Sequence, residues 1–133
     1  MIRLTRNILM VLFLVICIGC EDEEEPAATI EFKTGIGYTS QDAAIAKGSS
    51  LTVGVIATKA ENSLKTYTVS VSYDGASNTI TVQNFTISSD ENTLYDKDVN
   101  FMVRNQTGTE KYYFTIVDMD GNIVQRMLTF TIK

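Results

Sequence analysis

The chain has 133 residues, of which 44% are hydrophobic and 20% charged, and its formal net charge is −5 at pH 7. This length allows one domain of ordinary size. The sequence contains no histidine, which excludes a Ser-His-Asp triad, a Cys-His pair and a histidine-ligated zinc site. The composition therefore predicts a protein that is not an enzyme and that carries no cofactor.

The first predicted element is an N-terminal export signal. Arg3 and Arg6 precede an unbroken apolar run over residues 8–19. A transmembrane helix needs about 20 apolar residues, so this shorter run is typical of a signal peptide. A permanent membrane span is not expected.

The end of the apolar run, Cys17-Ile18-Gly19-Cys20, resembles the lipobox of bacterial lipoproteins, although a cysteine stands where that motif usually has leucine. The resemblance implies that residues 1–19 are a cleaved lipoprotein signal peptide. It also implies that Cys20 is lipidated and holds the protein to a membrane, and the folded part would then contain no thiol. The alternative is an uncleaved signal anchor.

Residues 20–27 are predicted to form the lipidated cysteine and an acidic tether. The run "EDEEE" at 21–25 is followed by Pro26. Its charges repel one another and anionic headgroups, so we expect the tether to hold the domain away from the membrane. An acidic run directly after a lipidated cysteine also resembles the surface-export signal of Bacteroidota lipoproteins. That resemblance implies an outer-membrane protein exposed on the cell surface; the alternative is the periplasmic face.

Residues 28–133 are predicted to form strands, because apolar and polar residues alternate with a period of two. The runs are 28–33, 51–58, 66–73, 79–82, 85–87, 98–104, 111–118 and 122–133. Asp-Gly pairs at 74–75 and 120–121 indicate turns. Residues 41–47 have room for only a single helical turn. The pattern predicts an all-β domain, an antiparallel β-sandwich of about seven strands.

The same alternation predicts which side chains face the core. The predicted inward set is Ile30, Phe32, Leu51, Val53, Val55, Ala57, Tyr67, Val69, Val71, Tyr73, Ile80, Val82, Phe85, Ile87, Val99, Phe101, Val103, Tyr112, Phe114, Ile116, Leu128, Phe130 and Ile132.

The last two runs carry a resemblance to a fold family. Tyr112-x-Phe114-x-Ile116-x-Asp118-x-Asp120-Gly121-Asn122, with a final strand ending in "LTFTIK", resembles the closing hairpin of immunoglobulin-like modules of the PKD and bacterial Ig-like type. Residues 26–133 also resemble the small single-domain lipoproteins common in Bacteroidota. The resemblance implies an immunoglobulin-like β-sandwich.

Two acidic segments are candidates for a site. The oxygen-bearing residues of Asp118 to Asn122, "DMDGN", resemble a calcium loop, but apolar residues follow where an EF-hand supplies further ligands, and a hairpin turn is the alternative. Asp90 to Asp98 contains several carboxylates, which either form a solvated loop or serve a metal or acid-base site. Catalysis by carboxylates would depend on Asp96 or Asp98.

Three tyrosines are candidates for ligand contact. Tyr38, Tyr95 and Tyr113 are predicted to lie in loops or on the outward side of strands, where a tyrosine ring can stack on a sugar or anchor a protein interface.

Charge and composition limit the classes of partner that we expect the protein to bind. Residues 26–133 carry nine basic and eleven acidic side chains without a basic cluster, which argues against nucleic acid as a partner. We therefore expect a non-enzymatic, lipid-anchored surface module that acts through protein–protein contacts in adhesion or assembly. The alternatives are a glycan-binding surface lipoprotein and a carboxylate-based enzyme.

Overall fold

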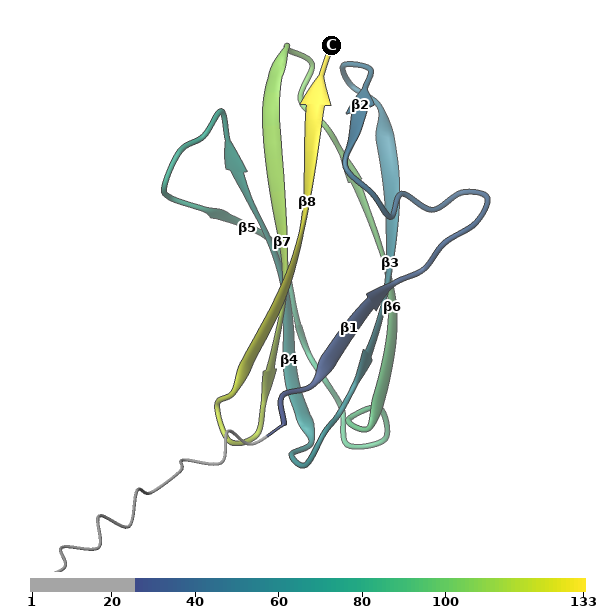
Figure 1. The fold of residues 1–133 in the computed structure, drawn as a ribbon, viewed down its shortest axis with the longest axis vertical. Coiled ribbons are helices and arrows are strands. Elements are labelled where there is room, and N and C mark those ends of the chain that lie inside the picture. Colours follow the sequence, from purple (N-terminus) through teal and green to yellow (C-terminus); the bar gives the residue numbers. More distant parts are fainter. Residues whose placement is uncertain (1–25) are drawn as a thin grey trace, which may run out of the picture.

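The computed structural model describes residues 26–133, which form eight β-strands (Figure 1). The strands are β1 (Thr29–Phe32), β2 (Ala43–Ile45), β3 (Ser50–Thr58), β4 (Leu64–Tyr73), β5 (Ile80–Thr86), β6 (Leu94–Met102), β7 (Gly108–Asp118) and β8 (Ile123–Ile132). Within this part of the chain no helix is long and apolar enough to cross a membrane.

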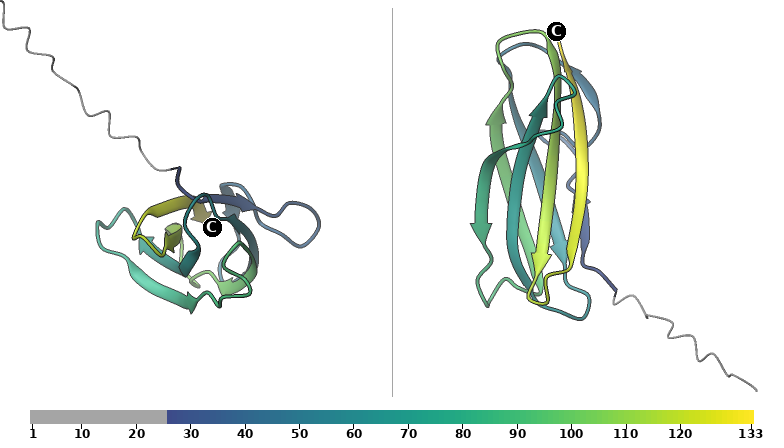
Figure 2. Two further views of the ribbon diagram at one scale, coloured as in Figure 1. Left: turned by 90° about the horizontal axis from the view of Figure 1, so that it is seen from below. Right: turned by 90° about the vertical axis from the view of Figure 1, so that its left-hand side faces the viewer.

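The strands form two sheets that pack face to face (Figure 2). One sheet has the order β1-β3-β6 and the other the order β2-β8-β7-β4-β5. All neighbouring strands are antiparallel except β2 and β8, which are parallel. The described chain begins near one end of the sandwich and finishes at the other (Figure 1).

This strand order is that of an immunoglobulin-like sandwich. In such domains strands A, B, E and D form one sheet, C, F and G form the other, and C′ joins the edge next to C. Here β1, β3 and β6 take the places of A, B and E, while β4, β7, β8 and β5 take those of C, F, G and C′. The predicted antiparallel immunoglobulin-like β-sandwich is therefore confirmed, with eight strands.

The core lies between the two sheets and is filled by the predicted alternation. Tyr67, Phe114 and Phe130 are fully buried, and Phe114 meets Phe32 of the opposite sheet edge-on with ring centroids 5.1 Å apart. Burying an apolar side chain of this size contributes about 1.5–3 kcal/mol, so these contacts hold the layers together. Every inward residue predicted outside β5 is buried or half-buried.

Two local predictions are wrong. Ile80 and Val82 were predicted to face the core but are 54% and 37% exposed. They lie in β5 at the outer edge of its sheet, and in the described chain no strand takes the place of D to cover it. Residues 41–47, whose sequence allowed one helical turn, instead contain β2, which pairs with the last residues of β8. Its partner is distant in sequence, so local pattern could not reveal it.

Candidate binding surface

The outer side of the five-stranded sheet is a broad surface almost without charge, seen face on in the right panel of Figure 2. Strand register aligns its outward side chains in rows across β5, β4, β7 and β8. We call this surface the uncharged face; it consists of Thr66, Thr68, Ser70, Ser72, Thr81, Asn84, Thr86, Lys111, Tyr113, Thr115, Val117, Ile123, Gln125, Met127 and Thr129. Lys111 is the single charged member of this set.

Hydrogen bonds between neighbouring strands order the polar side chains of the uncharged face. Thr68 Oγ1 donates to Asn84 Oδ1 over 2.9 Å, and Gln125 Nε2 donates to Thr115 Oγ1 over 2.9 Å. Cross-strand pairs of this kind stabilise a sheet modestly and hold the side chains in place. The face therefore presents a pre-ordered set of hydroxyl and amide groups.

Apolar and aromatic groups lie among these polar side chains. Tyr113 is half-buried, with Met127 directly opposite on β8, and the Lys111 ammonium lies 5.5 Å from the centre of the Tyr113 ring. Two rows along, beyond Thr115 and Gln125, Val117 pairs with Ile123. Met127 and Ile123 are 47% and 66% exposed. Few charges together with a partly exposed tyrosine and an exposed methionine are typical of the centre of a protein–protein interface.

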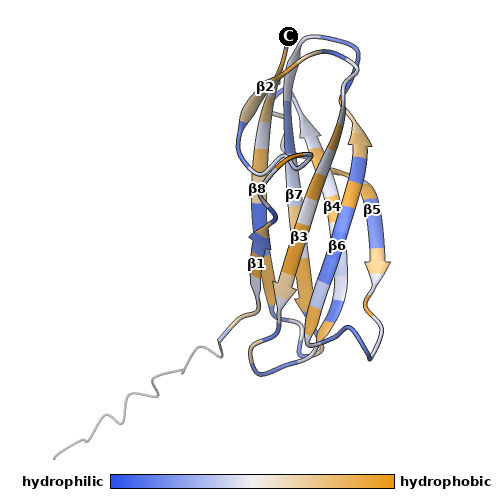
Figure 3. Ribbon diagram, turned by 90° about the vertical axis from the view of Figure 1, so that its right-hand side faces the viewer, coloured by the Kyte–Doolittle hydropathy of each residue, from blue (hydrophilic) through white to orange (hydrophobic). Residues whose placement is uncertain are grey.

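The outer side of the three-stranded sheet has the opposite character, because it carries paired charges. Lys33 forms ion pairs with Asp96 and Asp98, the latter over 2.8 Å, and the Tyr38 hydroxyl donates to Asp98 over 3.0 Å. The hydrogen bonds that Lys33 donates to Asp96 and Asp98 raise the pKa of Lys33, and the bond from Lys33 lowers the pKa of Asp98. Figure 3 shows hydrophilic and hydrophobic residues alternating along β6.

We call Lys33, Tyr38, Asp96 and Asp98 the charged cluster; it includes only part of the acidic segment predicted at residues 90–98. Asp96 and Asp98 lie on β6 and pair with Lys33, whereas Glu91 lies in the preceding turn and accepts a hydrogen bond from Ser88 over 3.1 Å. One lysine therefore pairs with both carboxylates of β6 and offsets one of their two negative charges. Among residues 26–133, no three histidine, cysteine, aspartate or glutamate side chains are grouped as metal ligands.

Gly54 of β3 makes room for the cluster to lie across the sheet. A methyl group added at Gly54 would lie 2.5 Å from Lys33 Cδ, 2.8 Å from Tyr38 Cε1 and 2.9 Å from Asp98 Oδ1. Real contacts of a methyl carbon are longer than this, so a side chain at residue 54 would push the three apart. Glycine thus leaves the space in which these three side chains lie.

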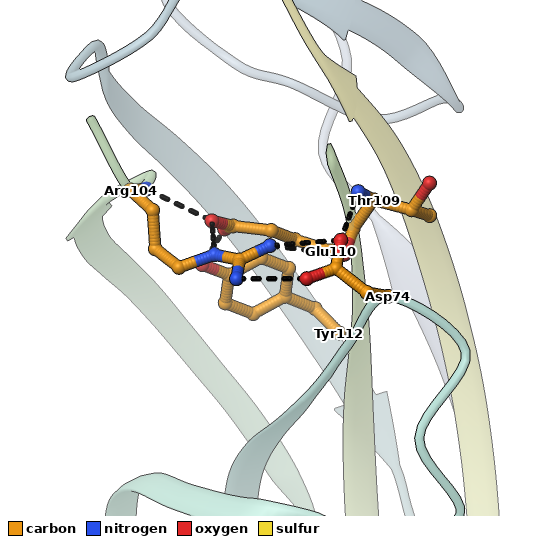
Figure 4. A network of polar contacts seen from close by, with 5 residues as sticks. All are labelled: Asp74, Arg104, Thr109, Glu110 and Tyr112. Atoms are coloured by element: carbon orange, nitrogen blue, oxygen red, sulfur yellow. Dashed lines mark hydrogen bonds and ion pairs between the residues drawn. The ribbon is translucent and has the colours of Figure 1, made fainter. Parts of the chain in front are cut away.

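A buried carboxylate organises the end of the sandwich where β4, β6 and β7 meet (Figure 4). Glu110 is 0% exposed, and its Oε1 accepts bonds from Arg104 N over 2.8 Å and Arg104 Nε over 3.0 Å. Its Oε2 accepts the Tyr112 hydroxyl over 2.7 Å. A buried charge is tolerated only when it is paired and hydrogen-bonded, as here. The arrangement indicates a structural role for Glu110.

Arg104 extends this network to the turn after β4. Its guanidinium bonds both carboxylate oxygens of Asp74, over 3.0 and 3.2 Å, and stacks on the Tyr73 ring with 4.1 Å to the centroid. Hydrogen bonds from Arg104 and the Thr109 N–H lower the pKa of Asp74. Asp74 has a φ of 54°, so these bonds also hold a left-handed residue in position.

The segment at 118–122 is a hairpin turn between β7 and β8. Asp118 Oδ1 accepts the backbone N–H groups of Asp120 and Asn122, each over 2.9 Å, and Oδ2 accepts the Asn122 side-chain amide over 2.9 Å. Burial would raise the pKa of Asp118, but these bonds outweigh it and lower the pKa. Both oxygens are thus engaged in the turn, while calcium binding stays a prediction.

The three tyrosines predicted as ligand contacts are not brought together. Tyr38 belongs to the charged cluster and Tyr113 to the uncharged face, on opposite sides of the sandwich. The exposure predicted for Tyr95 is wrong, because Tyr95 is 4% exposed and packs edge-on against Tyr67 with centroids 5.8 Å apart. Ligand contact stays a prediction for Tyr38 and Tyr113. The predicted lipidation site Cys20 and the acidic run lie outside the described residues.

The strand order defines an immunoglobulin-like β-sandwich domain. No protein-family model matches the chain, and no curated protein matches it. Among solved structures, murine CRIg aligns with a TM-score of 0.41 and 11% identity over 81% of this chain and 99% of that chain. A cohesin from the archaeon Archaeoglobus fulgidus, described as non-cellulosomal, aligns with a TM-score of 0.36 and 17% identity over 81% of this chain and 92% of that chain. These likenesses support no conclusion about function.

Proposed function

We propose that the protein is a non-enzymatic, lipid-anchored module of the cell surface that binds another protein through the uncharged face. The proposal combines the lipobox-like Cys20 and acidic run of the sequence with the character of this face. In this proposal the outer membrane holds the lipid, and the sandwich acts in adhesion or assembly.

The observation that carries the proposal is the unequal distribution of charge between the two sheets. One fifth of the chain is charged, yet the uncharged face has Lys111 as its single charged side chain. The opposite sheet bears Lys33, Asp96 and Asp98 in ion pairs. Desolvating charges is costly, so a surface from which they are depleted can be covered by a partner at lower cost.

The binding proposal is tested by crosslinking on intact cells that express a C-terminally tagged protein. Met127→Lys places a charge on the uncharged face, directly opposite Tyr113, and is expected to abolish capture of a discrete protein partner. The matched control is Met102→Lys, since Met102 is 67% exposed on β6 of the other sheet. Equal capture by both variants would contradict the use of the uncharged face.

The same cells test the anchor and its location. Cells supplied with labelled fatty acid are expected to label the unaltered protein and not Cys20→Ser, and protease added outside the cells is expected to remove the tag from the unaltered protein. A protected tag would place the domain in the periplasm. Binding of a polysaccharide in place of a protein, lost in Tyr113→Ala, would favour the glycan-binding alternative.

A further inference from the structure

We propose that β5 is a self-association edge: it pairs antiparallel with β5 of a second copy, so that two five-stranded sheets join into one. This inference concerns the edge of the sheet and does not depend on the partner proposed for the uncharged face. It rests on the character of β5 compared with the other outer strands.

The first step is that β5 lacks the charges that usually protect an edge strand. Unpaired edges attract other strands, and native proteins counter this with charges, proline or very short strands. Here β1 carries Glu31 and adjoins Lys33, β6 carries Asp96, Lys97 and Asp98, and β2 has three residues. No charged residue and no proline occur anywhere between Asp74 and Asp90. β5 thus differs from the other three outer strands.

The second step is that self-pairing suits an uncharged strand in particular. A symmetric dimer uses the same surface on both copies, so an antiparallel strand pair places each segment opposite itself. If β6 paired with its own copy around Lys97, Asp96 would stand opposite Asp98 of that copy, and like charges directly opposite destabilise a sheet. β5 places uncharged residues opposite one another in every register.

The third step is that β5 offers apolar surface at the same edge. Ile80 and Val82 are 54% and 37% exposed because the three-stranded sheet ends at β6 and does not cover them. Inside the sandwich, β5 is held in place, since Gln83 Nε2 donates to the Asn100 carbonyl over 3.3 Å and Lys97 lies 4.6 Å from the Phe85 ring centroid. The domain therefore holds β5 in position, and the strand exposes two apolar side chains to water beside the polar Thr81, Asn84 and Thr86.

β5 also has a β-bulge, a feature that can protect an edge strand, but it leaves most of the strand in regular pairing. The register of β4 against β5 shifts between Val69 and Ser70, which leaves Val82 without a direct partner on β4. Residues 83–86 stay in regular pairing, so four consecutive residues are available for a second strand, and Val82 lies beside them for apolar contact. Pairing would remove both Val82 and Ile80 from water.

The test is analytical ultracentrifugation of residues 26–133, the described part of the chain, which holds both sheets and the core between them, across a range of protein concentrations. We expect the domain to sediment as a dimer at high concentration and as a monomer on dilution. Val82→Lys and Ile80→Lys are each expected to weaken dimerisation at least tenfold, because each places two like charges at the interface. The matched control Ile123→Lys alters a residue that is 66% exposed on β8 and is expected to dimerise like the unaltered domain.

Several outcomes would overturn the proposal. A domain that stays monomeric up to about 1 mM shows no meaningful self-association. A dimer that survives both β5 variants, or that is lost in Ile123→Lys, uses another surface. Circular dichroism confirms that each variant is folded, and amide hydrogen exchange supplies a second readout. Concentration-dependent protection confined to β5 supports the pairing, and protection on another strand refutes it. None of these results depends on capture of a cellular partner.

Discussion

Replacing Glu110 by alanine tests whether the buried carboxylate organises the end of the sandwich. The substitution removes the acceptor of the Arg104 backbone N–H, the Arg104 Nε and the Tyr112 hydroxyl. Tyr112 is 2% exposed, so water cannot readily replace the lost oxygen at its hydroxyl. Arg104 keeps its bonds to Asp74.

The expected loss follows from these contacts. Breaking a buried ion pair by removing one partner costs about 3–5 kcal/mol, and the side chain of Arg104 is 23% exposed, which reduces that cost. We therefore expect Glu110→Ala to lower the free energy of unfolding by about 3 kcal/mol. For a domain of this size that loss corresponds to roughly 12 °C in Tm.

The assay is thermal and urea unfolding followed by circular dichroism, since the chain has no tryptophan for fluorescence. Glu110→Gln is the informative companion, because its amide keeps an oxygen for Arg104 and a nitrogen that can donate to the Tyr112 oxygen. It should lose less than half as much stability as Glu110→Ala. A double-mutant cycle with Arg104→Ala then measures the coupling between the two side chains.

The reasoning would be refuted by a loss below about 1 kcal/mol in Glu110→Ala, which is no more than one ordinary neutral hydrogen bond contributes. If Glu110→Gln and Glu110→Ala lost the same free energy of unfolding, the charge of Glu110 alone would account for its effect, and its hydrogen bonds would contribute nothing further.

Three further predictions concern other residues. Tyr67 is fully buried and its hydroxyl has no hydrogen-bond partner among the described residues. Tyr67→Phe should therefore leave Tm unchanged or raise it, whereas Tyr112→Phe should lower Tm because the Tyr112 hydroxyl bonds Glu110. The reverse order would show that the Tyr67 hydroxyl has a hydrogen-bond partner in solution. Gly54→Ala should displace the Lys33 side chain and lower Tm, and an unchanged Tm would mean that the cluster moves aside at no cost. The pKa of Asp118 is lowered in the folded state, so its contribution to stability is present above the unfolded pKa of about 3.9 and is lost as pH falls through the folded value. Asp118→Asn should flatten the decline of stability with acid below about pH 5, and an unaltered acid profile in urea unfolding would contradict this linkage.

Period-two alternation was enough to predict the sandwich and most of its core. It failed at β5, because the exposure of Ile80 and Val82 depends on where the opposite sheet ends. That boundary is set by the whole topology, and alternation along one strand carries no information about it. The same holds for β2, whose parallel partner β8 is at the other end of the chain.

Three misses were within reach of the sequence. Tyr95 is an even number of residues before Val99 and Phe101, so extending that run backwards would have placed it in the core. Glu110 likewise shares the inward register of Tyr112 and Phe114. Its partner Arg104 comes from the loop before β7, and no local pattern pairs the two. The uncharged face could also have been found in the sequence, because serine, threonine and asparagine occupy the outward positions of its strands.

The placement of the two chain ends has a mechanical consequence. The described chain enters at one end of the sandwich and leaves at the other, so tension between the two ends acts along the strands (Figure 1). β1 is joined to β3 over four residue pairs, and Arg126 Nη1 adds a bond to the Ile30 carbonyl over 3.0 Å. Pulling on the N-terminal side would shear these bonds together instead of opening them one by one. The attachment of β1 would resist a steady load until it yields in a single step, leaving the five-stranded sheet behind it intact.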